Sequence, residues 1–582
     1  MTNQPNQPAT NDGLVNLALG LLAMAFALGT DLWAGATAAA WLTTRQTLGI
    51  KAEQVPAALK ALPANLSNPA AAWPEPAASR LPGPFIYWPV TILLTAAVLF
   101  VLFKAWGMFH DRCDTLDKRK RLGVDTQPRF ALRKDLKPLA LRQPEPGRFL
   151  LGRAQTGQLL ATEPHTSQRS RRGPRPQPGP VMFVGPSRCG KTYAAINGIN
   201  TWLGPAILSS VKTDLLDETI DVRAQLGEIK VYDPAAITGH RRAHWTPLRG
   251  ATDPLQAERA ASLLIGAAPG AGGENDQFWA QHGATLVGGL LWLAAVTDHT
   301  MTDVARWITS YDQPTNDNPG DVAPLLRSLA TGSDAQAEHA RSLLKNLGGI
   351  WAGDSRMASS FYVSARPAIV PWSMPVVQNI SVENHIDLDW LTSGNNTLYL
   401  AAPVIDQDRM APALGGLIGD LITQALLQRR RLDPELLIVL DEAANTPLTQ
   451  LPSWASTVTS QGIQLVTIWQ SKSQLDEIYG RDAETILTNS RSRIFFSGTA
   501  DRSGLTYVNE LIGREHQPGI LAAGGRGSDA YDRANPTSVD VVPPNVLRQL
   551  NTGDAVLIHG NLPPVHLSAI NRLPRRWRLE AD

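Results

Sequence analysis

The stretch Val181-Met-Phe-Val-Gly185-Pro-Ser-Arg-Cys-Gly190-Lys191-Thr192 decides the fold class. A short apolar run ends in Gly-x-x-x-x-Gly-Lys-Thr, and the residues that follow can form a helix. Such a loop turns successive backbone N–H groups towards a polyphosphate, and the N-terminus of the helix favours anions. An ordinary Gly-rich turn is the alternative, and the apolar strand before the loop argues against it. We predict a nucleotide-binding loop, a Walker A motif, formed by Gly185, Pro186, Ser187, Arg188, Cys189, Gly190, Lys191 and Thr192.

A second motif complements this loop. The run Leu436-Leu-Ile-Val-Leu-Asp441-Glu442-Ala443 is typical of a fully buried strand with two carboxylates at its carboxyl end, a Walker B pattern. Lys191 is expected to reach the β- and γ-phosphates, while Thr192 and Asp441 hold Mg²⁺. Glu442 is predicted to polarise the attacking water as a general base. Together the two motifs predict a Mg-dependent ATPase, with ATP and Mg²⁺ as its cofactors.

Other strands share the pattern of an apolar run followed by a polar residue. The run Ile463–Trp469 ends at Gln470, which is predicted to contact the γ-phosphate and report its loss. Strands that alternate with helices of this length predict an α/β domain with a parallel sheet, in which ligands bind at the carboxyl ends of the strands. Late in the chain, the apolar run within Asp554–His559 indicates a strand, which we predict to lie at the edge of the sheet.

The two nucleotide motifs are far apart. About 250 residues separate Thr192 from Asp441, more than a compact ATPase core needs. Apolar spacings of three and four recur in the runs Leu255–Ala268, Phe278–Val296 and Ala335–Leu347. We therefore predict an all-α insertion domain over residues 253–390, within a P-loop ATPase domain formed by residues 181–252 and 391–575.

Composition excludes several classes of protein. The 582 residues carry a formal net charge of +1, so any binding of nucleic acid must come from local patches. The only cysteines are Cys113 and Cys189, too few for a disulfide framework or a zinc site. Cys189 lies inside the phosphate loop, where we interpret it as a space-filling residue.

Two apolar segments at the start of the chain, residues 14–34 and 86–106, are long enough to cross a membrane. A cleaved signal peptide is the alternative for the first, but Met1 to Gly13 contains no Lys or Arg. Basic residues follow the second segment, which places that side in the cytoplasm. We predict a multi-pass protein of the cell membrane with both termini cytoplasmic, a cytoplasmic tail at residues 1–13 and an extracytoplasmic connector at residues 35–85.

Residues 107–180 are predicted to form a basic cytoplasmic linker with short strands around Gly157. One basic group follows the second apolar segment, and a second lies in a Pro- and Ser-rich stretch with Arg169, Arg171, Arg172 and Arg175. The first group could bind lipid head groups or DNA, and the second could contact a polyanion. The alternative for the first group is an orientation signal only, and the alternative for the second is a solvated loop.

The chain resembles the conjugative coupling proteins of type IV secretion systems, the TraG/TraD-type ATPases, from the apolar segments to about Asn571. Besides the nucleotide motifs, the resemblance is carried by Val211-Lys-Thr-Asp214, Tyr232-Asp-Pro234, Trp245-Thr-Pro-Leu248, Asp276-Gln-Phe-Trp279 and the run from Gln470-Ser-Lys-Ser-Gln474 through Tyr479-Gly480 to Asn489. The last run is the most particular of these, because Walker motifs occur in many families.

The resemblance implies a RecA-like motor domain, a homo-hexamer around a central channel, and an all-α domain on the cytoplasmic side. It also implies recruitment of a relaxase–DNA complex to a secretion channel, and export of single-stranded DNA with attached protein driven by ATP. Relatives often place an arginine before the strand that begins at Ile463. Residues 455–462 contain none, so we assign no arginine finger; Arg491 and Arg493 are only weak substitutes.

Three functions remain open from the sequence. The first is a membrane-anchored coupling ATPase that moves single-stranded DNA. The second is a motor of similar ring architecture that moves double-stranded DNA or protein effectors. The third is a non-catalytic scaffold that binds nucleotide to assemble a ring, and the intact pair Asp441 and Glu442 argues against it.

Overall fold

The structure is a computed structural model that divides into two compact units, Met1–Thr126 and Gln127–Asp582. It describes residues 29–50, 52–117, 122, 124, 128–165, 177–269, 274–378, 383–446, 448–517, 537–570 and 573–577. The predicted tail at residues 1–13, most of the apolar segment at 14–34 and the four arginines between residues 169 and 175 lie outside these described residues.

The first unit is helical and has a small core of its own. A helix over residues 29–44 packs against the long helix α3 (Pro84–Asp117). Short helices lie between them: η1 (Ala52–Gln54), α2 (Val55–Ala61), η2 (Leu62–Asn65), η3 (Pro69–Ala72) and η4 (Ala78–Arg80). Trp73 and Tyr87 are buried at the centre, among alanines. The predicted connector is therefore a folded element, and α3 continues past residue 106 into the stretch predicted as linker.

Within the described part of the chain, two helices are long and apolar enough to cross a membrane. In α3, the stretch Pro84–Val101 has only 11% of its residues buried, whereas α15 (Gln407–Leu427) has 72% buried. The helix α15 is therefore a core helix of the second unit. The exposed apolar surface of α3 fits the membrane segment that the sequence predicts there.

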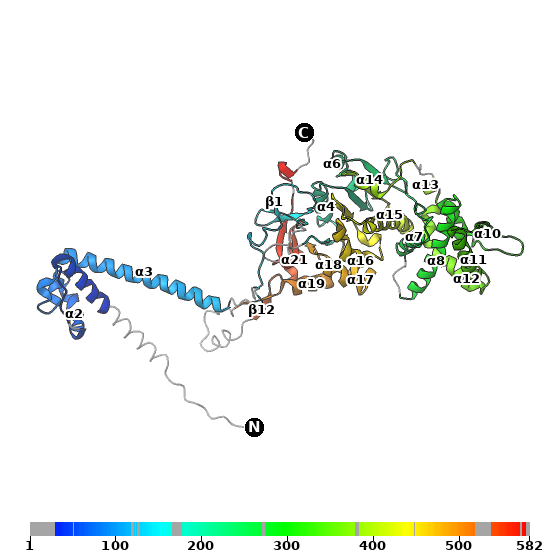
Figure 1. The fold of residues 1–582 in the computed structure, drawn as a ribbon. Helices are drawn as coiled ribbons and strands as arrows, with labels where there is room; N and C mark the ends of the chain where they lie inside the picture. Colours follow the sequence, from blue (N-terminus) through cyan, green and yellow to red (C-terminus); the bar gives the residue numbers. More distant parts are fainter. Residues whose placement is uncertain are drawn as a thin grey trace, which may run out of the picture. The chain divides into compact units, whose positions relative to one another are not determined.

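In the described residues of the second unit, twelve strands form one sheet. Figure 1 shows β1 and helices such as α4, α15 and α16 in this unit. Their order is β1-β3-β2-β14-β13-β10-β4-β9-β8-β5-β7-β6. The strands from β10 to β6 in this order are parallel, and the others pair antiparallel. The parallel strands are β4 (Val181–Val184), β5 (Ala206–Ser210), β6 (Ile229–Tyr232), β7 (Thr397–Ala401), β8 (Leu436–Leu440), β9 (Ile463–Trp469) and β10 (Ser492–Phe496).

The antiparallel part of the sheet corrects two predictions. It contains β1 (Ala140–Leu141), β2 (Leu150–Ala154), β3 (Leu159–Ala161), β13 (Ala555–His559) and β14 (Val565–Ser568). The strands β1 to β3, which the sequence assigned to the linker, belong to the same sheet as the nucleotide motifs. The predicted edge strand at residues 554–559 is wrong, because β13 lies inside the sheet between β10 and β14.

Both faces of the sheet are buried, which explains why its parallel strands are continuous apolar runs. In β4, Met182 and Val184 contact one core cluster, whereas Val181 and Phe183 contact the other. The first core includes residues of α15 and of the inserted helices, and the second includes residues of α4 (Lys191–Ile199) and β2. The sheet is thus covered on both faces. The polar residues that follow its parallel strands lie at the carboxyl ends of these strands, outside the two cores.

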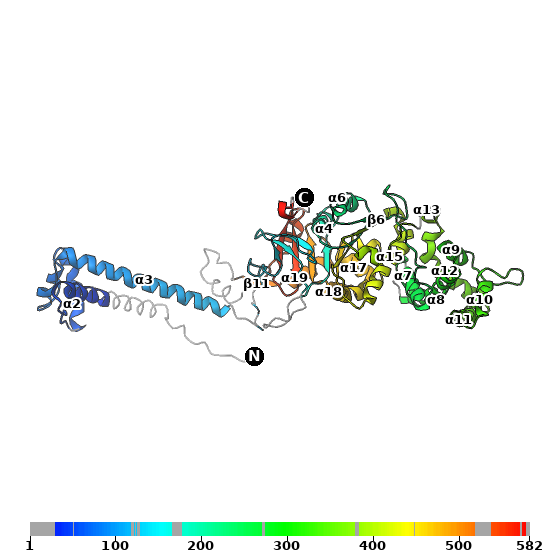
Figure 2. The ribbon, with the colours of Figure 1, turned by 45° about the horizontal axis from the view of Figure 1, so that its top comes forward.

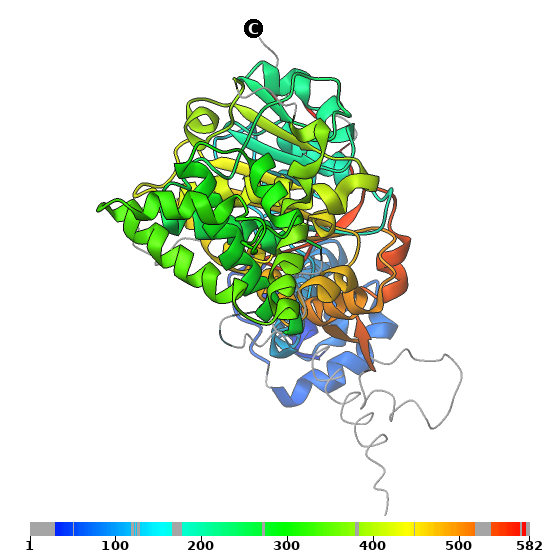
Figure 3. The same cartoon turned by 90° about the vertical axis from the view of Figure 1, so that its right-hand side faces the viewer.

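Between β6 and β7 the described elements are helices: α7 (Pro254–Gly266), α8 (Glu274–Val296), α9 (Met301–Thr309), α10 (Val322–Ala330), α11 (Ala335–Trp351), α12 (Ser355–Ile369), η5 (Val370–Ser373), α13 (Pro375–Gln378) and α14 (Leu388–Thr392). Figure 2 shows that α8 to α12, drawn in green, gather beyond α7 and α15, and Figure 3 shows the green helices in front. The helices α7 and α15 pack closely through glycines, since a Cβ on Gly419 would lie 2.5 Å from Leu263.

The remaining described α-helices of the second unit accompany the strands β5, β8, β9, β10 and β13. They are α5 (Asp214–Asp217), α6 (Ile220–Ala224), α16 (Leu451–Thr457), α17 (Lys472–Tyr479), α18 (Asp482–Asn489), α19 (Arg502–Ile512) and α21 (Pro544–Gln549). On α6, Arg223 is fully buried and donates to the carbonyls of Trp202 and Gly204. These carbonyls lie just before β5, so the guanidinium fixes the amino-terminal end of that strand.

Candidate functional site

The phosphate loop connects β4 to α4 at the carboxyl edge of the sheet. Two of its residues have positive φ, 63° at Arg188 and 100° at Gly190. A Cβ on Gly190 would also lie 3.0 Å from the Cα of Gly553, so this position requires glycine. Because α4 begins at Lys191, its free N–H groups face the space in front of the loop.

The side chain of Lys191 lies inside the loop and is only 8% exposed. Its ammonium donates to the carbonyl oxygens of Gly185 and Pro186, the latter at 2.6 Å. Burial lowers the pKa of Lys191, while the neighbouring Cys189, Asp441 and Glu442 oppose this shift. The loop therefore holds a cation where an anionic ligand would arrive.

Cys189 is buried beneath the loop, and burial raises the pKa of its thiol. A buried neutral thiol acts as a packing element.

The acidic pair follows β8 directly. The carboxylate of Asp441 accepts a hydrogen bond from Ser210 Oγ at 3.2 Å, and burial raises its pKa to about 6. Glu442 has a left-handed backbone with φ 52°, a strained conformation that places its carboxylate beside Asn445 and Lys212. Its Oε2 accepts from Asn445 Nδ2 at 2.9 Å, and its Oε1 lies 4.0 Å from Lys212 Nζ.

One cavity brings these groups together. It is lined by Ser187, Arg188, Gly190, Lys191, Thr192, Tyr193, Lys212, Asp441, Glu442 and Thr552. Of the other predicted residues, Gly185 and Pro186 contribute through their carbonyls to Lys191. Gln470 lies at the end of β9, between β4 and β8, but its side chain is exposed and does not line this cavity. Its contact with the γ-phosphate stays a prediction.

Three lining residues were missed by the sequence reasoning. Tyr193 follows the loop, Lys212 follows β5, and Thr552 comes from a turn before β13. The backbone N–H of Gly553 in the same turn donates to the Cys189 carbonyl at 3.0 Å. The Asn-Thr-Gly-Asp sequence signals a turn, yet nothing local shows that this turn meets the phosphate loop.

The two arginines weighed as substitutes for an arginine finger are engaged elsewhere. Arg491 precedes β10, so it lies at the amino ends of the parallel strands, whereas the phosphate loop lies at their carboxyl ends. Its Nη2 lies 2.6 Å from Glu163 Oε1. Arg493 donates to the Tyr507 hydroxyl at 2.6 Å. Neither side chain lines the phosphate cavity.

Glu163 follows β3 and links this strand to two others. It contacts Arg491, which precedes β10, and its Oε1 lies 2.9 Å from Nε2 of His559, the last residue of β13. Burial alone would raise the pKa of Glu163, but hydrogen bonds from His559 and Arg491 outweigh it and lower the pKa to about 2. A depressed folded-state pKa stabilises the fold above the ordinary pKa of the carboxyl, and this contribution is lost as the pH falls towards 2.

Replacing Glu163 by glutamine is therefore expected to lower the free energy of unfolding by on the order of 3 kcal/mol at neutral pH. The gap between wild type and variant should shrink between about pH 4.5 and pH 2, because the wild-type carboxylate becomes protonated there. Unfolding midpoints measured across this pH range check the prediction. A gap that widens in acid would contradict it.

The oxygen donors of the cavity fit a nucleotide bound with Mg²⁺. Within the lining, Asp441 supplies a carboxylate and Thr192 a hydroxyl group, and Ser210 Oγ donates to the Asp441 carboxylate from outside it. The described residues contain no cluster of three or more His, Cys, Asp or Glu that could hold a metal alone. This suits Mg²⁺, which keeps most of its ligands as water and phosphate oxygens.

A phosphate loop on a parallel strand, an acidic pair two strands away and a sheet covered on both faces define a P-loop ATPase fold of the RecA-like type. The chain belongs to the type IV secretory system conjugative DNA transfer family, whose sequence model matches residues 159–570. No curated protein matches the sequence.

Solved structures of TrwB, a bacterial conjugative coupling protein, have a similar fold. An unbound form is 18% identical with a TM-score of 0.52, covering 76% of this chain and 98% of that one. TrwB in complex with ADP and Mg²⁺ is 18% identical with a TM-score of 0.51, covering 75% and 97%. TrwB with a non-hydrolysable ATP analogue is 18% identical with a TM-score of 0.50, covering 75% and 98%. At this identity the likeness concerns the fold.

Proposed function

We propose that this protein is a membrane-anchored, Mg-dependent ATPase that couples hydrolysis to the transfer of single-stranded DNA through a type IV secretion channel. The observation that carries this function is the single cavity that joins Lys191, Thr192, Asp441 and Glu442 in a chain of the conjugative DNA transfer family. TrwB, which shares the fold, binds ADP with Mg²⁺ and an ATP analogue.

In this mechanism Lys191 exchanges its two carbonyl partners for the β- and γ-phosphates of ATP. Thr192 and Asp441 would hold Mg²⁺, whose charge would offset the negative charge of the phosphates. Glu442 accepts the proton of the attacking water, and Asn445 and Lys212 orient its carboxylate. Gln470, at the end of β9, reports the loss of the γ-phosphate to the rest of the subunit.

The remaining parts of the proposal concern assembly. The protein works as a homo-hexamer in the inner membrane, with two membrane-spanning helices and both termini in the cytoplasm. It recruits DNA with a bound relaxase and delivers it to the secretion channel. The exposed apolar stretch of α3 supports the membrane anchor. The alternative is a translocase of similar ring architecture that moves double-stranded DNA or protein effectors.

The full chain, purified in detergent, should hydrolyse ATP faster with single-stranded DNA than with duplex DNA or without DNA. Contacts to the phosphate backbone of the DNA dominate the binding of single strands, so the stimulation of ATP hydrolysis should fall steeply as the salt concentration rises. Lys191→Ala should lower turnover at least about 100-fold, because a group that stabilises phosphate charge is lost. Lys345→Ala, at an exposed lysine on α11, is the matched control and should leave turnover unchanged.

The other outcomes separate the alternatives. Stimulation by duplex DNA alone would replace the single-strand proposal with the alternative motor. The absence of turnover with every polymer would favour a scaffold that binds nucleotide without hydrolysing it.

A further inference from the structure

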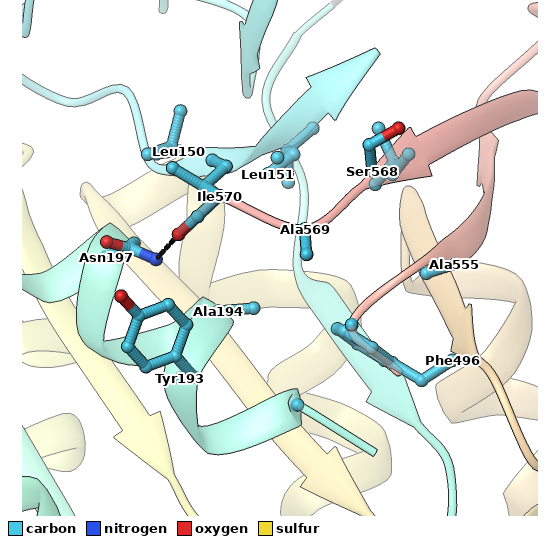
Figure 4. A pocket seen from close by; sticks show the side chains of 14 residues that line it. Leu150, Leu151, Tyr193, Ala194, Asn197, Phe496, Ala555, Ser568, Ala569 and Ile570 are labelled. Atoms are coloured by element: carbon cyan, nitrogen blue, oxygen red, sulfur yellow. Dashed lines mark hydrogen bonds between the residues drawn. The ribbon is translucent and has the colours of Figure 1, made fainter. Parts of the chain in front are cut away.

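The phosphate loop and its helix are held at three places by other parts of the second unit. The turn before β13 holds the middle of the loop, because Gly553 donates to the Cys189 carbonyl. The segment after β14 holds α4, and Figure 4 shows this contact at the edge of a pocket, where Asn197 Nδ2 donates to the Ile570 carbonyl. The third contact joins the first residue of the loop to the end of β9, where the run that begins at Gln470 starts.

This third contact passes through the peptide unit between Trp469 and Gln470. The carbonyl of the unit, which belongs to Trp469, accepts from the N–H of Gly185 at 3.1 Å. The N–H of the unit, which belongs to Gln470, donates to Oε1 of Gln474 at 3.1 Å. A peptide unit is planar and rigid. The place of the first loop residue and the place of the Gln474 side chain are therefore linked through one group.

Gln474 lies in the first turn of α17. Ser471 caps this helix, since its hydroxyl accepts from the Gln474 N–H at 3.1 Å. Ser-x-x-Gln is the pattern of a capping box, in which the glutamine side chain reaches back to the N–H of the capping serine. Here it reaches one residue farther, to Gln470, which directly follows β9. The glutamine therefore ties the helix to the end of the strand.

The helix α17 is in turn bonded to α19. The carboxylate of Asp476 accepts from the Ser503 hydroxyl at 2.8 Å and pairs with Lys472 at 2.8 Å. The hydroxyl of Ser473 lies 3.4 Å from Oδ2 of Asp501, whose side chain caps α19. A connected set of hydrogen bonds thus runs from the phosphate loop through the end of β9 to both helices.

We propose that Gln474 is a positioning residue of the nucleotide site, and that α17 and α19 shift together with the phosphate loop when the γ-phosphate is lost. The inference rests on the proposed hydrolysis of ATP. Gln474 does not line the phosphate cavity, so it acts through the peptide unit that it holds. That unit fixes the backbone of Gln470, whose exposed side chain makes no hydrogen bond within the described residues and can turn towards a ligand.

An ordinary helix cap is the other interpretation of these contacts. A cap stabilises α17 to the same extent whichever nucleotide is bound, and its loss acts on folding. A positioning residue acts on turnover and makes the helices respond to the nucleotide. Two measurements on the full chain in detergent separate these roles.

The first measurement is the turnover of Gln474 variants with the DNA that stimulates the wild type most. Gln474→Leu removes the acceptor oxygen and should lower kcat about tenfold, while KM for ATP stays within about twofold because Lys191, the proposed phosphate ligand, is unchanged. Gln474→Glu keeps an oxygen that can accept the same N–H, and its kcat should stay within about twofold of wild type. Gln336→Leu, at an exposed glutamine on α11, is the matched control and should change neither constant.

The unfolding midpoints of these variants should stay within about 3 °C of wild type, because water can replace the lost acceptor at this exposed hydrogen bond. A fall in kcat at an unchanged midpoint is what a helix cap alone would not produce.

The second measurement is hydrogen exchange with Mg²⁺ and either ADP or a non-hydrolysable ATP analogue. In the wild type and in Gln474→Glu, exchange in α17 and in the first turn of α19 should differ between the two nucleotides. In Gln474→Leu this difference should be lost in both helices. The comparison in the wild type needs no variant, so it also covers the case in which Gln474→Leu does not fold.

The positioning role would be overturned by a wild-type kcat in Gln474→Leu, by a Gln474→Glu variant as slow as Gln474→Leu, or by equal exchange of α17 with both nucleotides. In each case, hydrolysis by the wild type that depends on Lys191 would leave the proposed ATPase standing. If the wild type neither binds nor hydrolyses ATP, the proposed function itself fails, and the positioning role fails with it.

Discussion

Replacing Glu442 by glutamine is expected to lower DNA-stimulated ATP turnover about 10²- to 10⁴-fold, because the amide cannot accept a proton from the attacking water. The affinity for ATP should stay within a few fold of wild type, since Lys191, Thr192 and Asp441, the proposed ligands of the phosphates and Mg²⁺, are unchanged. The hydrogen bond from Asn445 can be kept by the amide oxygen, so the local fold is retained. Steady-state turnover and equilibrium binding of ATP, measured on the same preparation, check both parts.

Glu477→Gln, at an exposed glutamate on α17, is the matched control and should have wild-type turnover. If Glu442→Gln hydrolyses ATP at the wild-type rate, another group activates the water and the assignment of Glu442 is wrong.

Replacing Arg223 by methionine is expected to destabilise the second unit by about 3 to 5 kcal/mol. The guanidinium is fully buried and donates to the Thr397 hydroxyl and to the carbonyls of Trp202, Gly204 and Asn395. Methionine fills the space but leaves these acceptors without a donor. Burial lowers the pKa of Arg223 to about 10, still high enough for the group to be charged at neutral pH.

The shift in the unfolding midpoint, followed in detergent, measures this effect. Arg223→Lys should be intermediate, because one ammonium cannot reach all of the acceptors. Arg327→Met, at an exposed arginine on α10, should change the free energy of unfolding by less than about 0.5 kcal/mol. A stable Arg223→Met variant would show that the carbonyls before β5 find other donors.

The parts of the site that could be predicted are those encoded in short stretches. The phosphate loop and the acidic pair are recognisable because each motif contains both its buried strand and its polar end. Parallel strands bring such ends to one edge of a sheet, so the meeting of Lys191 with Asp441 follows from the pattern.

The missed parts depend on contacts between distant segments. Thr552 and Gly553 reach the phosphate loop because β13 pairs antiparallel with β10. The sequence of neither strand indicates that the two are neighbours. The same pairing explains why the prediction of an edge strand at residues 554–559 was wrong. The folded connector of the first unit was missed because alanine and proline are equally compatible with an irregular chain.

The turn at Thr552 and Gly553 also sets an order of events during synthesis. Domains fold as the chain emerges, beginning from the N-terminal side. Both Walker motifs therefore leave the ribosome before Thr552, which lines the phosphate cavity from the turn before β13. A nascent chain thus has its phosphate cavity open on the Thr552 side until this turn is in place.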